Sequence, residues 1–297
     1  MDKHIKGYIL VVISLLLTSI SFILSTIVIK EIGVPSTAFF MFAAGLIAST
    51  MILIASRKVK ELTLLVRRYW KPVIAIGILN SISAVLWLSS LNLIGPSLTA
   101  FLGRFGTIFT IILGLLFLKE RFNRLELLGA IIMIGGAFVL SYNGGNFIII
   151  GVILVLILSL TFSVWQLITK IYIKRINPIA MNHIRLMFTF TVFALYIAAT
   201  QDLNVPSLNI IGLAALGSIS GGVIGFLLSY KAMQMTDLSK ISTISSLEPF
   251  IVMLYSFIIL HTIPTGYQFL GGFIIVAGTL FLVMGRYKPK FIERFIE

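Results

Sequence analysis

The chain has 297 residues, of which 59% are hydrophobic and only 11% are charged, and its mean hydropathy is +1.09. A water-soluble fold cannot bury that share of apolar surface, so the composition predicts an all-α protein that crosses a membrane many times. The formal charge of +13 could suggest nucleic acid, but the basic residues fall in short segments between apolar runs, which excludes that partner. The absence of cysteine excludes disulfides and thiol catalysis, and we expect no cofactor and no metal site.

Ten apolar segments of helical length follow one another along the chain. They are expected at Gly7–Ile29, Ser36–Ser56, Pro72–Leu93, Ser97–Leu118, Leu125–Tyr142, Ile148–Tyr172, Ile179–Ala199, Leu208–Met235, Leu238–Leu260 and Gly266–Met284. The connections are short, for example Ile94–Pro96, so neighbouring helices should pack as antiparallel hairpins. The first segment is too long for the core of a signal peptide, and no small-residue cleavage site follows it. It is therefore expected to be the first membrane helix.

Lys and Arg in the connecting segments predict the orientation. With the N-terminus placed inside, nearly all of them lie on the inner side, and Lys30 alone lies outside. The positive-inside rule then places both termini in the cytoplasm. The protein is expected in the plasma (inner) membrane.

The chain contains an internal repeat. Laying Leu91–Leu140 on Met233–Leu282 without a gap matches Gly129 with Gly271 and Gly136 with Gly278, among other pairs. We expect a first five-helix repeat over residues 1–145 and a second, with a basic cytoplasmic tail, over residues 146–297. Because five is odd, the second copy must enter the membrane from the opposite side. Inverted repeats are typical of transporters, with the substrate near the midplane where the copies meet; the alternative is an old duplication in a membrane scaffold.

Polar residues at helical spacing predict a central cavity. Two stripes occupy equivalent helices of the two copies: Ser14, Thr18, Ser21 and Ser25, and then Ser159, Ser163, Gln166 and Lys170. The alternative is that such hydroxyls only return hydrogen bonds to their own helix or join neighbouring helices. The first, third, fourth, sixth, eighth and ninth helices are expected to enclose the cavity. The candidate substrate-binding residues are Ser14, Thr18, Ser21, Asn80, Trp87, Arg104, Trp165, Gln166, Arg185, Ser245 and Glu248. The glycine row Gly217, Gly221 and Gly225 is interpreted as a packing ridge.

Glu248 is a carboxylate near the middle of the ninth apolar segment, directly before Pro249. A carboxylate at that depth costs about 2.5–3.5 kcal/mol, so it should be neutral or paired with a cation such as Arg104, Arg185 or Lys231. It could carry a coupling proton, bind a substrate amine, or form a structural ion pair. The excess of cations over carboxylates favours a substrate of negative or zwitterionic character.

Two further segments are amphipathic. Apolar residues alternate with Lys and Arg in Val59–Tyr69 and again in residues 290–296. Both are expected to lie on the cytoplasmic membrane surface against anionic lipid headgroups.

Catalytic and nucleotide-binding motifs are missing: there is no HExxH, no GxSxG in a strand–helix context and no Walker A sequence. The sequence therefore predicts neither an enzyme nor an ATP-driven pump. The run LKER…LLGAIIMIGG after the fourth apolar segment and SSLEP in the ninth resemble the EamA-type transporters of the drug/metabolite transporter superfamily. That resemblance implies ten helices in two inverted five-helix repeats and movement of small metabolites, often amino acids, without ATP. Two positions depart from the family pattern. Glu120 has Thr262 as its counterpart in the second copy, and Arg185 has Phe42 as its counterpart in the first.

The sequence thus predicts a secondary transporter that exports a small polar metabolite, in the first place an amino acid or a related compound. The alternatives are an exporter of amphiphilic or cationic drugs, or a non-transporting membrane assembly factor. Besides its small-molecule substrate and the anionic lipid surface, a second copy of the chain in a homodimer is left open as a partner.

Overall fold

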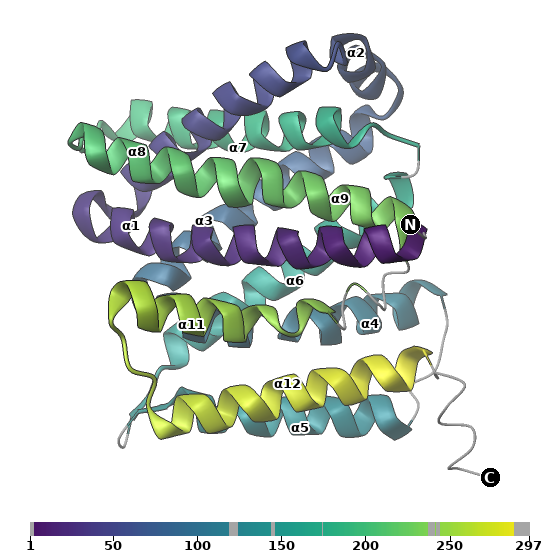
Figure 1. Cartoon of the computed structure of the whole chain (residues 1–297), viewed down its shortest axis with the longest axis vertical. Coiled ribbons are helices and arrows are strands. Elements are labelled where there is room, and N and C mark those ends of the chain that lie inside the picture. Colours follow the sequence, from purple (N-terminus) through teal and green to yellow (C-terminus); the bar gives the residue numbers. More distant parts are fainter. Residues whose placement is uncertain are drawn as a thin grey trace.

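The structure is a computed structural model that describes residues 3–118, 124–143, 146–173, 175–236, 241 and 244–287. Its long helices run alongside one another in a bundle (Figure 1). They are α1 (Lys3–Ala55), α2 (Val59–Arg68), α3 (Trp70–Leu102), α4 (Phe105–Leu118), α5 (Arg124–Ser141), α6 (Ile149–Tyr172), α7 (Pro178–Thr200), α8 (Leu208–Gly217), the π-helix η1 (Ser218–Gly225), α9 (Phe226–Met235), α11 (Glu248–Leu260) and α12 (Gly266–Tyr287). Between α5 and α6, the two-residue strands β1 (Tyr142–Asn143) and β2 (Asn146–Phe147) pair antiparallel. The described chain is otherwise helical or irregular, as the composition predicts.

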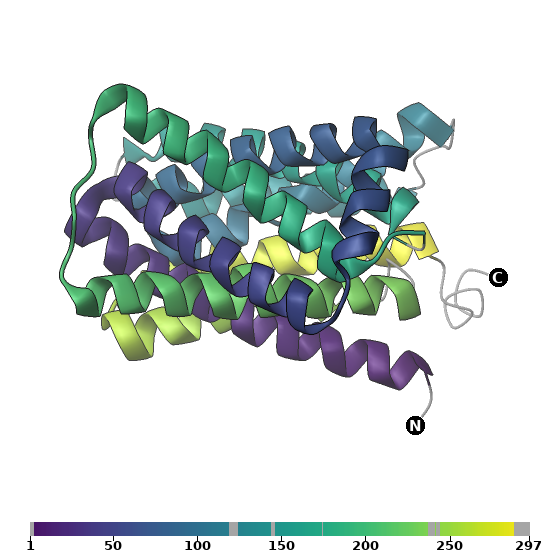
Figure 2. The same ribbon diagram turned by 90° about the horizontal axis from the view of Figure 1, so that it is seen from above.

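The two longest helices each reverse at a glycine. In α1, Gly33 has φ 75° and ψ 171°, and in α3, Gly95 has φ 76° and ψ 173°. A positive φ is open to glycine without the steric cost that a Cβ imposes. Pro35 and Pro96 follow, and proline is well placed in the first turn of the returning helix. The arm of α1 that follows Gly33 consequently runs back along the bundle in the direction opposite to the first arm (Figure 2).

Seven segments of the described chain are long and apolar enough to cross a membrane. They are Ile5–Ala55, Trp70–Leu102, Arg124–Ser141, Ile149–Tyr172, Pro178–Thr200, Leu208–Met235 and Gly266–Gly285, and Glu248–Leu260 is a shorter apolar helix. The first has 51 residues, far more than the roughly 20 that span a bilayer, because it contains both arms of α1. Large apolar side chains such as Met51 (66% exposed) and Leu195 (65%) cover the outer surface, as expected where lipid is the solvent. The chain is thus built as a multi-pass membrane protein.

Helices α5 and α12 pack backbone against backbone through the glycines that the repeat matches. A Cβ on Gly129 would lie 2.7 Å from the Gly278 carbonyl oxygen, and one on Gly278 would lie 2.8 Å from that of Gly129. Gly136 and Gly271 face each other in the same way, at 3.0 Å and 2.8 Å. The repeat matches Gly129 with Gly271 and Gly136 with Gly278, and the contact between Gly129 and Gly278 is thus mirrored by the contact between Gly271 and Gly136. A two-fold axis between two antiparallel helices produces this reciprocal pattern.

The first predicted amphipathic segment forms helix α2. Leu65 is buried against the bundle, while Leu64 is 63% exposed and Arg67 and Arg68 end the helix. Helix α2 lies at the end of the bundle where α1 begins at Lys3 and α12 ends at Tyr287 (Figure 1), which we call the Lys3 end. The second amphipathic segment, residues 290–296, lies outside the described residues, as do Glu120 and part of the expected span Leu238–Leu260.

Candidate functional site

Two helices are interrupted near the centre of the bundle. The sequence predicts a continuous helix over Ser97–Leu118, but α3 ends at Leu102 and α4 starts at Phe105. In the second copy, a turn at Ser246 and Leu247 precedes α11. Pro249 therefore occupies the first turn of a helix, where its missing N–H costs nothing, instead of weakening the middle of one. Both interruptions free backbone carbonyl groups for contacts with side chains.

An ion pair joins the two interruptions. Arg104 Nη2 lies 2.8 Å from Glu248 Oε2, and Arg104 Nη1 donates to the Ser245 carbonyl oxygen at 2.7 Å. Thr18 Oγ1 donates to Glu248 Oε1 at 2.8 Å, so both carboxylate oxygens are engaged. The Arg104 side chain is 18% exposed and the Glu248 side chain is 13% exposed. Of the three candidate cations, Arg104 is the one that pairs with Glu248.

Arg185, by contrast, is bound by neutral groups alone in the described part of the chain. Its Nη1 donates to Asn80 Oδ1 at 3.2 Å, its Nη2 to Asn182 Oδ1 at 2.9 Å, and its Nη2 also to the Gly222 carbonyl oxygen. The guanidinium carbon lies 4.2 Å from the centre of the Phe226 ring, in cation–π contact. Arg185 is 3% exposed. Its charge is therefore held by dipoles and a ring face, and no described carboxylate neutralises it.

The π-helix η1 supplies one of the Arg185 acceptors and two further carbonyl acceptors nearby. Three of its carbonyl oxygens accept from side chains of other helices: Gly222 from Arg185, Val223 from Asn182 Nδ2 at 3.2 Å, and Gly225 from Ser14 Oγ at 2.8 Å. A π-helix inside an apolar segment is rare and frequently marks a functional site. The predicted packing ridge is confirmed, because a Cβ on Gly221 would lie 2.5 Å from Ser21 Cβ and one on Gly225 would lie 2.9 Å from Thr18 Cγ2.

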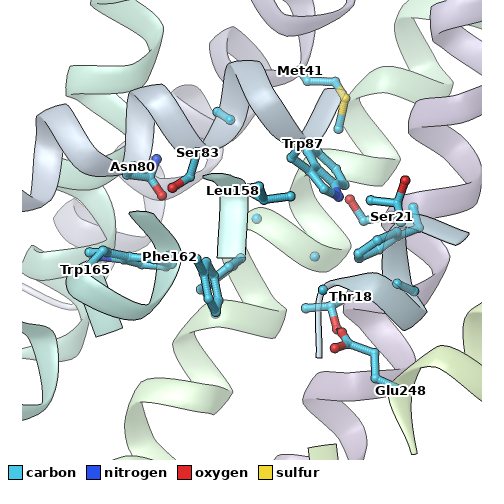
Figure 3. A pocket seen from close by; sticks show the side chains of 18 of the residues that line it. Thr18, Ser21, Met41, Asn80, Ser83, Trp87, Leu158, Phe162, Trp165 and Glu248 are labelled. Atoms are coloured by element: carbon cyan, nitrogen blue, oxygen red, sulfur yellow. The ribbon is translucent and has the colours of Figure 1, made fainter. Parts of the chain in front are cut away.

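Two cavities lie in the centre of the bundle. The first cavity has a volume of about 200 Å³ and is lined by Ser21, Asn80, Trp87 and Arg185, among others (Figure 3). The second cavity, of about 170 Å³, is lined by residues that include Ser14, Gln166 and Ser245. Residues on both linings are Thr18, Gly103, Arg104, Phe162, Trp165, Phe226 and Glu248. Every predicted substrate-binding residue lines at least one of the cavities, and its contact with a substrate stays a prediction.

More helices enclose the cavities than the six that the sequence predicts. The second arm of α1 contributes Met41 and Phe42, α7 contributes Arg185, and α12 contributes Val283. Phe42 stacks on Phe193 with ring centres 5.7 Å apart and planes 6° from parallel. A phenylalanine on an apolar helix carries no polar signal, so periodicity could not have found it. Thr18 and Glu248 lie side by side at the edge of the first cavity (Figure 3).

Unpartnered polar atoms gather on the second cavity. Four buried polar atoms of its lining have no hydrogen-bond partner among the described residues: Arg104 Nε, Trp165 Nε1, Thr169 Oγ1 and Tyr230 Oη. A buried polar group without a partner is costly, so such a cluster indicates a place for polar ligand atoms.

Comparisons with known proteins give a family match and a similar fold. A family model described as the EamA-like transporter family matches residues 5–142 and again residues 149–284. A solved structure titled "Crystal structure of protein" aligns over 94% of this chain and 97% of its own, with a TM-score of 0.71 and 16% identity. At that identity the likeness extends to the fold alone. A search of curated proteins found no match.

Proposed function

Because the chain belongs to the EamA-like transporter family, we propose that it is a secondary transporter that exports a small polar metabolite, an amino acid or a related compound, across the plasma membrane. Alternating access to the central cavities would move the substrate without ATP. The observation that carries this proposal is Arg185, a buried cation without a described carboxylate partner on the wall of a cavity.

The topology proposed for this transporter is ten membrane helices in two inverted five-helix repeats, with both termini cytoplasmic. Three observations support it. The family model matches the chain twice, α1 and α3 reverse at Gly33 and Gly95, and α5 and α12 contact each other reciprocally. The basic helix α2 lies at the Lys3 end, which the positive-inside rule assigns to the cytoplasm.

The substrate class follows from the charges around the first cavity. Glu248 neutralises Arg104, while Arg185 stays positive, so the wall has an uncompensated positive charge. A substrate carboxylate would compensate it. Asn80, Asn182 and the Gly222 carbonyl oxygen accept from four of the five Arg185 N–H groups, and the fifth, on Nη1, is left to donate to a carboxylate. The rest of the wall includes Phe22, Trp87 and Phe162, which suit an apolar or aromatic side chain.

Transport into proteoliposomes tests the proposal. Purified protein should accumulate or exchange radiolabelled L-amino acids, and Arg185→Gln should abolish that flux in a protein that still folds. Flux of cationic drugs without flux of amino acids would favour the drug-export alternative, against which the positive wall argues. No flux with either class would favour the assembly factor.

The peripheral contacts of this transporter are also proposals. Helix α2, with Leu65 inserted in the bundle and Arg67 and Arg68 at its end, suits a cytoplasmic surface of anionic lipid. The homodimer stays a prediction.

A further inference from the structure

The two central cavities share one wall. The first cavity continues toward the glycine bends, with Phe22 and Thr99 among its own residues, while the second continues toward the Lys3 end along Gln166, Thr169 and Met233. Gln166 and Thr169 lie in the last two turns of α6 and Met233 in the last turn of α9. Between the cavities stand the Arg104–Glu248 pair and the rings of Phe162, Trp165 and Phe226. A solute moving from one cavity to the other must pass this wall.

The contact that Glu248 makes with α1 has an uncharged counterpart elsewhere in the repeat. The gap-free shift that aligns the repeat places Glu248 on Gly106, and the matched polar stripes of the first helices place Thr18 on Ser163. The equivalent contact exists in both copies: Thr18 Oγ1 donates to Glu248 Oε1, and Ser163 Oγ donates to the Gly106 carbonyl oxygen, each at 2.8 Å. One copy thus makes the helix contact with a backbone carbonyl and no charge. The helix contact by itself therefore does not require a carboxylate at position 248.

Arg104 also has bonding capacity that Glu248 does not use. Its buried Nε has no hydrogen-bond partner in the part of the chain that the structure describes, and the same holds for Trp165 Nε1 on this wall and Tyr230 Oη in the second cavity. Trp165 and Tyr230 are each 1% exposed. These groups can donate to the oxygens of an anionic ligand, and a carboxylate bound to them would compete with Glu248 for the Arg104 guanidinium.

We propose that the Arg104–Glu248 ion pair is a gate between two binding stations, opened when a zwitterionic substrate exchanges with it. The substrate carboxylate passes from Arg104 in the second cavity to Arg185 in the first, in the outward direction of the proposed export, and its ammonium group occupies Glu248 while the pair is apart. Both charges stay compensated throughout, which a molecule with only one of the two groups cannot achieve. This inference rests on the proposed function, whose substrate and step it specifies.

Thiol accessibility tests the gate without relying on transport. The native chain has no cysteine, so single reporters can be read alone. Ala84→Cys reports on the first cavity only and Ser229→Cys on the second only. An impermeant thiol reagent applied at the face with the Lys3 end should modify Ser229→Cys and should react with Ala84→Cys at least 10-fold more slowly.

Opening the gate should change one reporter and leave the other alone. Adding Glu248→Gln or Arg104→Gln should raise the rate at Ala84→Cys by 10-fold or more, with Ser229→Cys unchanged as evidence of an intact fold. The exchanged pair Arg104→Glu with Glu248→Arg should restore protection. Glu61→Gln, which breaks the exposed Lys58–Glu61 pair in α2, is the matched control and should change neither rate. An unprotected Ala84→Cys beside the intact pair, or one indifferent to Glu248→Gln, overturns the gate.

The substrate step has its own readout. In the protein with an intact pair, an equimolar mixture of the L-amino acids other than cysteine, whose thiol would consume the reagent, should raise the Ala84→Cys rate several-fold, whereas methylamine and acetate together should not. Equal effects of the mixture and the one-charge compounds would refute exchange with a zwitterion. Amino-acid flux without pair-dependent protection of Ala84→Cys would support the proposed function and overturn the gate. Pair-dependent protection without amino-acid flux would support the ion pair as a barrier and contradict the proposed function.

Discussion

Replacing Glu248 with Gln removes one charge from the centre of the protein and keeps the size of the side chain. The amide oxygen can still accept from Thr18, but it no longer pairs with Arg104. Removing one partner of a fully buried ion pair costs about 3–5 kcal/mol. The two side chains are still 18% and 13% exposed, so solvent screens part of their interaction. We therefore expect Glu248→Gln to lower the free energy of unfolding by about 2–3 kcal/mol.

A double-mutant cycle separates this electrostatic cost from other effects of the substitution. Arg104→Gln alone should also destabilise, and the double variant should recover about 1–2 kcal/mol, since the remaining group is no longer left unpaired. Thermal unfolding of the detergent-purified protein measures each term. Additive losses in the double variant would refute the direct pairing of Arg104 with Glu248.

Transport by the same variant distinguishes the roles left open for Glu248. If the carboxylate exchanges with substrate, Glu248→Gln should abolish concentrative transport in a folded protein. If it also carries a coupling proton, the pH dependence of any residual flux should vanish. Unchanged, pH-dependent flux at normal expression and stability would remove Glu248 from the mechanism.

Four further predictions follow from other parts of the structure. Gly136→Ala should cost about 1–3 kcal/mol in thermal unfolding, because its Cβ would lie 2.9 Å from the Ile275 nitrogen, whereas Gly135→Ala, with no atom within 4 Å, should be neutral or slightly stabilising; equal effects would contradict the close approach of α5 and α12. Arg185→Lys should reduce substrate binding at least 10-fold by isothermal titration, because an ammonium group cannot reproduce the fork that contacts Asn80 and Asn182; wild-type affinity would exclude Arg185 from the site. In oriented vesicles, an impermeant thiol reagent should reach Val205→Cys from outside and Arg57→Cys from inside. The opposite pattern would show that the proposed orientation is wrong. Arg67→Gln with Arg68→Gln should lower the thermal stability gained from phosphatidylglycerol over phosphatidylcholine, and an undiminished gain would exclude α2 as the lipid contact.

Much of the architecture could be predicted from local sequence because its causes are local. Apolar runs of helical length must be satisfied by intra-helical hydrogen bonds in lipid, so their positions predict the helices directly. Gly33 and Gly95, each close to a proline, mark the reversals because few other residues adopt their backbone angles. Polar residues at helical spacing likewise predict the lining of a cavity, since a lipid-facing position would leave them without partners.

Only the tertiary structure decided how the charges pair and where the helices break. Three cations stood at membrane depth in the sequence, and helix packing brings Arg104, not Arg185, to Glu248. The interruption at Gly103 and the π-helix over Ser218–Gly225 have no local signal either, because their freed carbonyls accept from side chains distant in sequence, namely Ser159, Arg185 and Ser14. Hydrophobic periodicity determines which face of a helix turns inward, but a hydrogen bond or ion pair depends on atoms from two helices meeting within about 3 Å. That distance is set by the packing of the whole bundle.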